Sequence, residues 1–209
     1  MGARKSSSVL AAGSIWLLLV AAGSARFWQY KQTAAAEPAS PDRWPKTSRL
    51  PQSPFRPTLL LFAHPHCPCT GASIEELAQL IAHTQGRLST HVVFFRPQGS
   101  KPSWARGDLW DAAAAIPGVS IHDDEGGREA ELFHGATSGH CVLYGVDGSR
   151  LFDGGITSSR GHAGDSRGFG TLLALAYGQT PEQRQTEVFG CPILVPQVDA
   201  ISGGKSCNR

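Results

Sequence analysis

The sequence predicts an α/β protein with a central mixed sheet flanked by helices. Apolar runs of strand length alternate with segments in which apolar residues recur at helical spacing, and this alternation is typical of a sheet with helices on both faces. The last two predicted strands flank Asp147-Gly148, a strong signal for a tight turn, so they should form an antiparallel hairpin at the sheet edge. The chain has 209 residues, 41% of them hydrophobic, which is enough for one packed domain with extensions.

The predicted elements follow one another along the chain. The continuous apolar run 58–63 predicts a strand that is buried on both faces of the sheet. Helical spacing then predicts a helix over residues 71–83, with Thr70 or Ser73 as its N-cap and Gly86 at its end. The remaining predicted elements are strand 91–96, helix 104–115, strand 119–121, helix 127–134, strand 140–146, strand 150–153 and helix 169–177.

The N-terminal part of the chain is typical of an export segment. Residues 1–8 carry two basic side chains ahead of the predicted membrane or signal segment 9–27, whose apolar run ends at Ala25, and positive charge in this place keeps an N-terminus cytoplasmic. We therefore expect a single-pass anchor in the inner membrane, with the domain on the periplasmic side. The small residues Gly23-Ser24-Ala25 leave a cleaved signal peptide open as a second interpretation, which would give a secreted periplasmic protein. A helix buried in a soluble domain is the third.

Composition divides the rest of the chain into three parts. Residues 28–56 are rich in Ala and Pro, and prolines forbid a continuous helix or strand, so we expect a linker that spaces the domain from the membrane. Residues 57–180 form the predicted domain, and residues 181–209 an irregular C-terminal extension. The net charge is +2 and no dense basic run follows the N-terminus, so we expect no nucleic-acid partner.

The candidate reactive group is the cysteine pair Cys67-Pro68-Cys69, preceded by His64 and His66, between the first strand and the first helix. Only a thiolate attacks a disulfide, and a helix N-terminus lowers the pKa of a thiol placed there. We expect Cys67 to be the more exposed, attacking thiol and Cys69 to resolve the mixed disulfide. The two histidines are expected to add positive charge or relay protons. A disulfide within Cys-Pro-Cys closes a strained ring, which favours an oxidant or isomerase over a strong reductant.

A metal site is the main alternative for the same residues. Cys67 and Cys69 beside His64 and His66 offer soft ligands for copper or zinc, and His162 is the best remote candidate for a further ligand. In the redox interpretation the redox-active disulfide Cys67–Cys69 makes a cofactor unnecessary. A non-catalytic binding module is a third interpretation.

The order of elements around the cysteine pair resembles the thioredoxin-like superfamily, and within it the membrane-anchored TlpA/ResA-type proteins. The residues that carry this likeness are Val119 through Asp123, Ala130, Phe133-His134-Gly135, Val142-Leu143, Asp147-Gly148 and Gly154-Gly155. More narrowly, Cys-Pro-Cys with Thr137-Ser138-Gly139-His140, Gly155-Ile156-Thr157 and Phe189-Gly190-Cys191-Pro192 is similar to a bacterial group labelled RedB.

The chain departs from this family at two places. The family usually has Cys-x-x-Cys where this chain has Cys67-Pro68-Cys69, and it places a cis-proline where this chain has Thr137-Ser138-Gly139. The resemblance implies that the backbone of Thr137 and Ser138 pairs with an extended substrate, and that their hydroxyls hydrogen-bond the thiolate. An ordinary polar turn before a strand is the alternative. The implied partners are exported proteins with cysteines, an unidentified membrane or periplasmic electron partner, and the membrane through the N-terminal helix.

Three further cysteines complete an odd total of five, which purely structural disulfides do not explain. Cys141 lies in an apolar strand and should be a buried, inert thiol. Cys191 is a candidate third redox thiol or metal ligand that returns to the active site. Cys207 is expected on a flexible end, where pairing with Cys191 is the competing interpretation.

Overall fold

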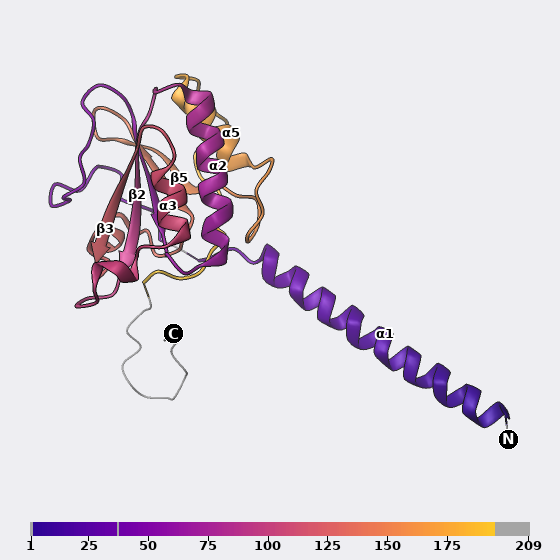
Figure 1. Cartoon of the computed structure of the whole chain (residues 1–209). Helices are drawn as coiled ribbons and strands as arrows, with labels where there is room; N and C mark the ends of the chain where they lie inside the picture. Colours follow the sequence, from indigo (N-terminus) through magenta and orange to yellow (C-terminus); the bar gives the residue numbers. More distant parts are fainter. Residues whose placement is uncertain (1, 37, 195–209) are drawn as a thin grey trace.

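The protein consists of one long helix that projects from a compact sheet domain (Figure 1). The structure is a computed structural model that describes residues 2–36 and 38–194, with side chains described from residue 11 onward. Cys207, and with it the competing Cys191–Cys207 pairing, lies outside the described residues.

The domain is built on five strands in the order β3-β2-β1-β4-β5. Strands β1, β2 and β3 run parallel to one another, whereas β4 is antiparallel to both β1 and β5. The α/β class with a mixed sheet, and the terminal hairpin of β4 and β5 at one edge, are therefore confirmed. The strand bounds are β1 Thr58–Ala63, β2 Ser89–Arg96, β3 Val119–Glu125, β4 His140–Tyr144 and β5 Arg150–Gly155.

Helices cover both faces of the sheet, as predicted. On one face, Leu59 and Leu61 of β1 pack against α2 (Pro68–Thr84), α3 (Asp108–Ala114) and α5 (Arg167–Ala176). On the other face, Leu60 and Phe62 pack with α4 (Arg128–Phe133). Because successive side chains of a strand point to opposite faces, the apolar run of β1 supplies both cores at once.

Helix α2 begins earlier than the spacing of its apolar residues predicts. Cys67 is the N-cap residue, and Pro68 opens the helix, a position where its fixed φ and missing N–H cost nothing. Thr70 and Ser73, the expected caps, lie inside the helix and are buried. The helix stops before Gln85, which adopts the left-handed conformation at φ 48° and precedes Gly86.

Two other elements also differ in length from their prediction. The expected helix 104–115 is a short 3₁₀ turn (Pro102–Trp104) followed by α3. Strand β3 continues to Glu125 rather than stopping at residue 121. Its polar end pairs with Arg96 of β2, whose guanidinium contacts Asp123 at 2.8 Å and Glu125 at 3.1 Å. Ion pairs across the strands replace the apolar contacts that the sequence prediction relied on.

The segment expected to be a linker is partly packed on the domain. Helix α1 (Gly2–Gln32) includes its first residues, and three residues between 40 and 50 are fixed to the domain by the following contacts. The Trp44 ring packs edge-on against Phe133 and Tyr144, with ring centroids 5.0 and 5.3 Å apart. Leu50 is buried, and the Ser40 N–H donates to Asp153 Oδ2 at 2.8 Å. Burial of these side chains corrects the prediction of a spacer over the whole of residues 28–56.

The described part of the C-terminal extension is irregular, as predicted, but it packs against the domain. Gln185 forms a parallel bridge with Asp153 of β5, and the Thr186 hydroxyl donates to the carbonyl of Gly155 at 2.9 Å. Phe189 and Ile193 are buried further along. The domain therefore continues beyond residue 180, and its last segment runs from the edge of β5 toward the cysteine pair.

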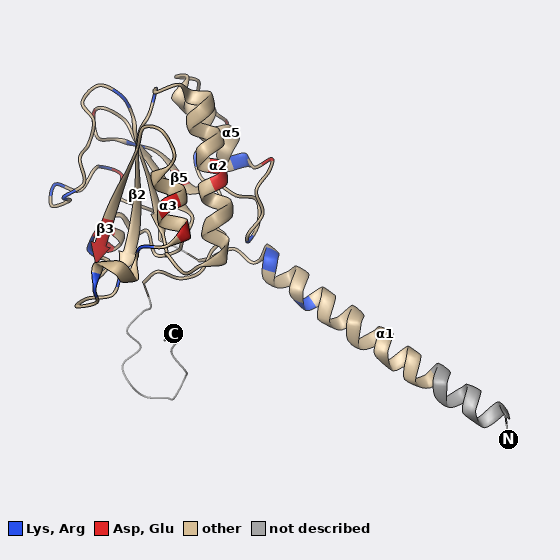
Figure 2. Ribbon diagram, viewed as in Figure 1, with Lys and Arg blue, Asp and Glu red and all other residues tan. Residues whose placement is uncertain are grey.

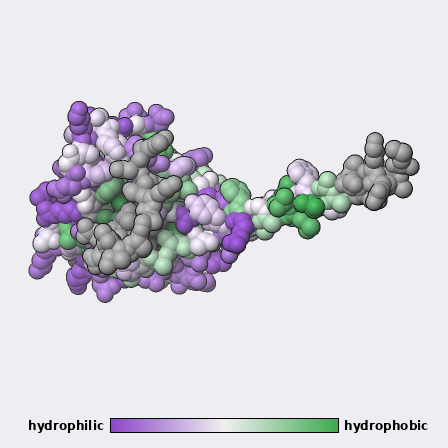
Figure 3. Space-filling view, turned by 90° about the horizontal axis from the view of Figure 1, so that it is seen from below, coloured by the Kyte–Doolittle hydropathy of each residue, from purple (hydrophilic) through white to green (hydrophobic). Residues whose placement is uncertain are grey.

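Helix α1 contains one stretch, Ala11–Gln32, that is long and apolar enough to cross a membrane. None of this stretch is buried in the domain, so the interpretation as a buried helix is wrong. Charged residues are scattered over the domain but are sparse along the described part of this helix (Figure 2), and its surface is largely apolar (Figure 3). A membrane anchor and a signal sequence both fit these properties.

Candidate functional site

The site begins at the turn between β1 and α2. Cys67 has extended backbone angles, φ −89° and ψ 119°, and stands at the N-terminus of α2, where the first backbone N–H groups have no helical partner. Cys69 follows within the first turn of the same helix. The apolar strand, the cysteine and the helix-opening proline together place a thiol in the partial positive charge of a helix N-terminus.

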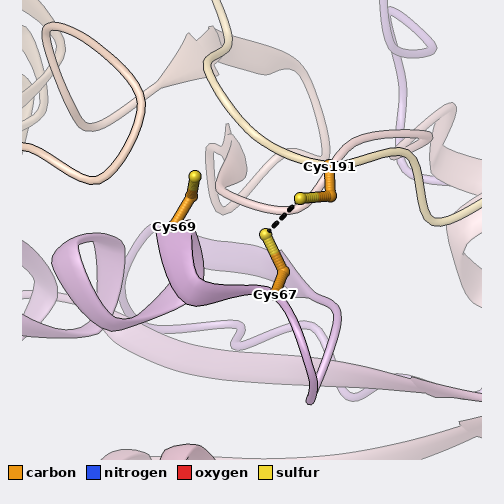
Figure 4. Close-up of side chains that lie close together, drawn as sticks. All are labelled: Cys67, Cys69 and Cys191. Carbon is orange, nitrogen blue, oxygen red and sulfur yellow. Dashed lines mark hydrogen bonds between the residues drawn. The ribbon is translucent and has the colours of Figure 1, made fainter. Parts of the chain in front are cut away.

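A third thiol reaches this turn from the C-terminal extension. Cys191 Sγ lies 2.7 Å from Cys67 Sγ, although the two residues are 124 positions apart in the chain. The sulfur atoms of Cys67, Cys69 and Cys191 all lie within 4.8 Å of one another. Figure 4 shows Cys67 and Cys69 pointing from the start of α2 toward the segment that carries Cys191. The candidate third thiol is thus at the site.

The three thiols differ in their readiness to ionise. The hydrogen bond from Cys191 is the largest of several effects that lower the pKa of Cys67 to about 5. Burial, followed by the charge of Cys67, raises the pKa of Cys69. The same hydrogen bond and burial raise the pKa of Cys191. At neutral pH the site therefore holds one thiolate, on Cys67, next to two thiols, which is the arrangement required for nucleophilic attack on a disulfide.

The attacking thiol is not the exposed one, contrary to prediction. Cys67 is only 2% exposed, whereas Cys69 and Cys191 are partly exposed. Residues 188–193, which we call the cover segment, bring Cys191 against Cys67. Sequence reasoning missed this because irregular chain that lacks any periodic pattern gives no sign of where it packs.

The Thr137-Ser138 loop faces the cysteine turn, but its contacts differ from those the resemblance implies. The Ser138 hydroxyl accepts a hydrogen bond from the His64 N–H at 2.9 Å and lies 2.6 Å from the Thr70 hydroxyl. It therefore holds the turn rather than the thiolate. The side-chain hydrogen bonds that lower the pKa of Cys67 come from Cys191, which has the largest effect, and from Thr70. No cis peptide bond occurs in the described chain.

The backbone of this loop is already paired, and its partner belongs to the same chain. The Ser138 N–H donates to the carbonyl of Cys191 at 2.9 Å, and Thr137 forms an antiparallel bridge with Pro192. The position expected to bind an extended substrate is thus filled by the cover segment, a placement that the sequence did not reveal.

The histidines support the turn and lie apart from the group of sulfur atoms. His64 stacks on Phe95 and accepts a hydrogen bond from the His66 N–H through Nδ1 at 3.1 Å. Burial, and then the charge of His66, lower the pKa of His64, so at neutral pH it is uncharged and does not add the expected positive charge. His162 is exposed. Among the described residues, the group that could hold a metal ion consists of the three cysteines and includes none of these histidines.

Arg160 is a site residue that sequence reasoning missed. Its guanidinium donates to the carbonyl of Gly190, directly before Cys191, and lies 5.0 Å from the ring centroid of Tyr30 at the end of α1. Its charge opposes the burial that raises the pKa of Cys69. A single arginine in a Gly- and Ser-rich loop carries no pattern that marks it.

Cys141 belongs to the core. It is fully buried in β4, and burial raises its pKa. An inert thiol is what the sequence led us to expect at this position.

Comparison with known proteins supports the fold. No protein-family model and no curated protein matches the chain. An uncharacterized conserved protein from Geobacillus kaustophilus is similar in structure, with a TM-score of 0.55, 21% identity, and coverage of 68% of this chain and 79% of that one. A hypothetical protein from Sinorhizobium meliloti 1021 has a TM-score of 0.53, 18% identity, and coverage of 78% and 93%.

More distant similarity extends to a secreted Mycobacterium tuberculosis disulfide oxidoreductase, with a TM-score of 0.40, 15% identity, and coverage of 59% of this chain and 81% of that one. The strand order, the hairpin at the sheet edge and the cysteine turn before α2 define a thioredoxin-like fold, as predicted. Membership in the RedB-like group stays a prediction.

Proposed function

We propose that the protein is an extracytoplasmic thiol–disulfide oxidoreductase or isomerase that acts on cysteines of envelope proteins. The observation that carries this proposal is the position of Cys67 at the N-terminus of α2, with its Sγ 2.7 Å from Cys191 Sγ. The hydrogen bond with Cys191 is the first cause that lowers the pKa of Cys67 to about 5, whereas a free cysteine, with a pKa of about 8.5, is largely protonated at neutral pH.

The proposed reaction starts with attack of the Cys67 thiolate on one sulfur of a substrate disulfide. A Cys67–substrate disulfide forms, the substrate S–S bond breaks, and the second substrate sulfur leaves as a thiolate that takes up a proton. Cys67 then carries no negative charge, so one of the effects that raise the pKa of Cys69 disappears. Cys69 is thereby prepared to lose its proton and attack Cys67, which releases the substrate as a thiol and leaves a Cys67–Cys69 disulfide.

These steps reduce the substrate, and each of them is reversible. The one-residue spacing of the pair favours the reverse direction, in which a substrate thiolate attacks the Cys67–Cys69 disulfide and the substrate is oxidised, or isomerisation through the Cys67–substrate disulfide, because strained disulfides are more oxidising. A reduction potential as low as that of thioredoxin, about −270 mV, would contradict this direction. Pro68 fits this proposal, since it holds the two cysteines at the start of α2.

The location and partners rest on helix α1. A span of 22 residues that contains an 18-residue window of mean hydropathy 1.3 suits a single-pass anchor in the inner membrane, with the domain on the periplasmic side. Cleavage after the same segment would release the domain on that side. The partners are then exported proteins with cysteines and a membrane or periplasmic electron partner, as in the membrane-anchored thioredoxin-like proteins that the sequence resembles.

Catalysed reduction of insulin and refolding of scrambled ribonuclease test the proposal. The wild-type protein should be active in at least one assay, and Cys67→Ser should reduce the rate to that of the buffer. Cys141→Ala is the matched control, because this thiol is buried in the core away from the site. Equal rates for Cys67→Ser and wild type would refute the proposal.

A copper site is the second candidate function, and the convergence of three sulfur atoms within 4.8 Å favours it. Thiolate ligands select Cu(I), and zinc sites of this kind require a fourth ligand. Stoichiometric Cu(I) binding by the reduced protein, lost in Cys67→Ser/Cys69→Ser, would support this function. Binding that persists in the double variant would exclude these thiols as the ligands.

A further inference from the structure

The cover segment is bound as an extended peptide along the Thr137-Ser138 loop. Three main-chain contacts define its register: the antiparallel bridge of Thr137 with Pro192, the Ser138 N–H to the Cys191 carbonyl at 2.9 Å, and the Ile193 N–H to the Ala136 carbonyl at 2.6 Å. Backbone pairing of this kind is how a strand is added to an exposed edge in peptide recognition.

Side chains on both sides of Cys191 anchor the cover segment. Phe189 is 5% exposed and Ile193 is 3% exposed, so an apolar side chain is buried two positions before and two positions after the cysteine. Between them, Gly190 lets the backbone of the cover segment approach the Thr137-Ser138 loop closely, because a Cβ on this residue would overlap the Ser138 carbonyl oxygen. The Arg160 guanidinium donates to the Gly190 carbonyl. The segment is thus seated by specific contacts at every position around Cys191.

We propose that the cover segment occupies the site in the way that a substrate polypeptide would. It presents Cys191 to Cys67 and forms a Cys67–Cys191 disulfide in the oxidised protein. It must leave the Thr137-Ser138 loop before another polypeptide can bind there. This inference rests on the proposed function and deepens it. It assigns the resolving step to Cys191, whose Sγ is 2.7 Å from Cys67 Sγ, rather than to Cys69.

The co-reactant in this thiol–disulfide exchange is a polypeptide that contains a disulfide, which accepts the two electrons. The Cys67 thiolate attacks that disulfide when the cover segment is displaced, which gives a Cys67–substrate disulfide and one substrate thiol. When the segment returns, Cys191 loses its proton and attacks Cys67, the mixed disulfide breaks, and the second substrate sulfur leaves as a thiol. In this direction the protein gives up two electrons from Cys67 and Cys191, and the substrate disulfide takes them up. In reverse, a substrate thiolate attacks the Cys67–Cys191 disulfide at Cys67 and Cys191 leaves as a thiol, after which a second substrate thiolate displaces Cys67 and the substrate is oxidised.

The cover segment also indicates the substrate class. A competing polypeptide would be extended, with a small residue before its cysteine to pass the Ser138 carbonyl and apolar residues two positions to either side, as in Phe189-Gly190-Cys191-Pro192-Ile193. Folded proteins rarely present cysteines in this form, so unfolded or newly exported chains fit best.

Disulfide mapping of the full chain oxidised by a small excess of oxidised glutathione is the first test. A Cys67–Cys191 link joins two separate proteolytic peptides, whereas a Cys67–Cys69 link lies within one, so mass spectrometry of the unreduced digest distinguishes them. We expect the Cys67–Cys191 link as the main product, retained in Cys69→Ser. A Cys67–Cys69 or Cys69–Cys191 link as the main product would overturn the inference.

Alkylation of reduced protein tests whether the segment covers Cys67. In Gly190→Ala the new Cβ should keep the segment off the loop, while Gly170→Ala is a control because its Cβ meets nothing within 4 Å. The rate of Cys67 alkylation should be compared at the high-pH plateau, where changes in pKa no longer contribute. We expect an increase of about tenfold or more for Gly190→Ala alone, equivalent to about 1.4 kcal/mol. An unchanged plateau rate would refute the covering role.

The two proposals fail in different ways. A Cys67–Cys69 product together with full insulin or ribonuclease activity would remove the role of Cys191 and leave the proposed function intact. Full activity of Cys67→Ser would remove the proposed function itself, whatever disulfide forms.

Discussion

Replacing Cys191 with alanine removes the thiol that donates to Cys67 Sγ, and it isolates the contact on which the reactivity of the site depends. That hydrogen bond is the first cause of the lowered pKa of Cys67, which is about 5. A hydrogen bond to a charged group contributes about 1.5–3 kcal/mol, and one pH unit of pKa corresponds to about 1.36 kcal/mol. The pKa of Cys67 should therefore rise by about 1–2 pH units in Cys191→Ala.

The assay is the rate of Cys67 alkylation in the reduced protein as a function of pH. The midpoint of this profile gives the pKa of Cys67, and following the Cys67 adduct by tandem mass spectrometry separates it from the other thiols. Cys191→Ser is the matched control, because its hydroxyl still offers a donor and should preserve most of the lowering. An unchanged midpoint in Cys191→Ala, or an equal rise in both variants, would refute the electrostatic reasoning.

Three further predictions concern stability, measured as the free energy of unfolding in denaturant. Ser138→Ala removes the acceptor of the partly buried His64 N–H and should cost about 1–3 kcal/mol, whereas Ser158→Ala, at an exposed position, should cost little. Trp44→Ala should cost about 2–3 kcal/mol through lost aromatic packing; no loss would restore the linker interpretation. Burial is the main cause that lowers the pKa of His91 from 6.5 to about 4, so the unfolded state binds more protons between these values. The contribution of His91 to the free energy of unfolding should be fully present above pH 6.5 and should fall by up to about 3 kcal/mol as the pH drops to 4. This fall should be smaller in His91→Gln.

The sequence predicts the sheet well because its strands have a strong local signal. The apolar run of β1 predicts a strand that is buried on both faces, and Asp147-Gly148 is a strong signal for a tight turn. The order of the elements along the chain and the terminal hairpin therefore follow without long-range information. The position of the cysteine pair between β1 and α2 follows in the same way, although the start of α2 at Pro68 does not.

The contacts within the site that the sequence did not predict join distant segments. Ser138 and Cys191 were candidates, but the hydrogen bond of Ser138 to His64 and the contact of Arg160 with Gly190 form only after the chain has folded. The cover segment has neither helical nor alternating periodicity. Trp44 was misjudged for the same reason, since prolines around it indicate irregular chain but do not indicate whether that chain is packed. Irregular segments are thus where the sequence-based account needed most correction.

The most direct test of the central claim, that Cys67 exchanges disulfides with exported proteins, is a search for trapped mixed disulfides in the native envelope. The variant Cys69→Ser/Cys191→Ser removes both thiols that lie within 4.8 Å of Cys67 and are able to resolve such an adduct. We expect it to accumulate polypeptides bound through Cys67 that reductant releases, and the triple variant that also carries Cys67→Ser to accumulate none. An empty trap, or the same adducts in both variants, would contradict the claim.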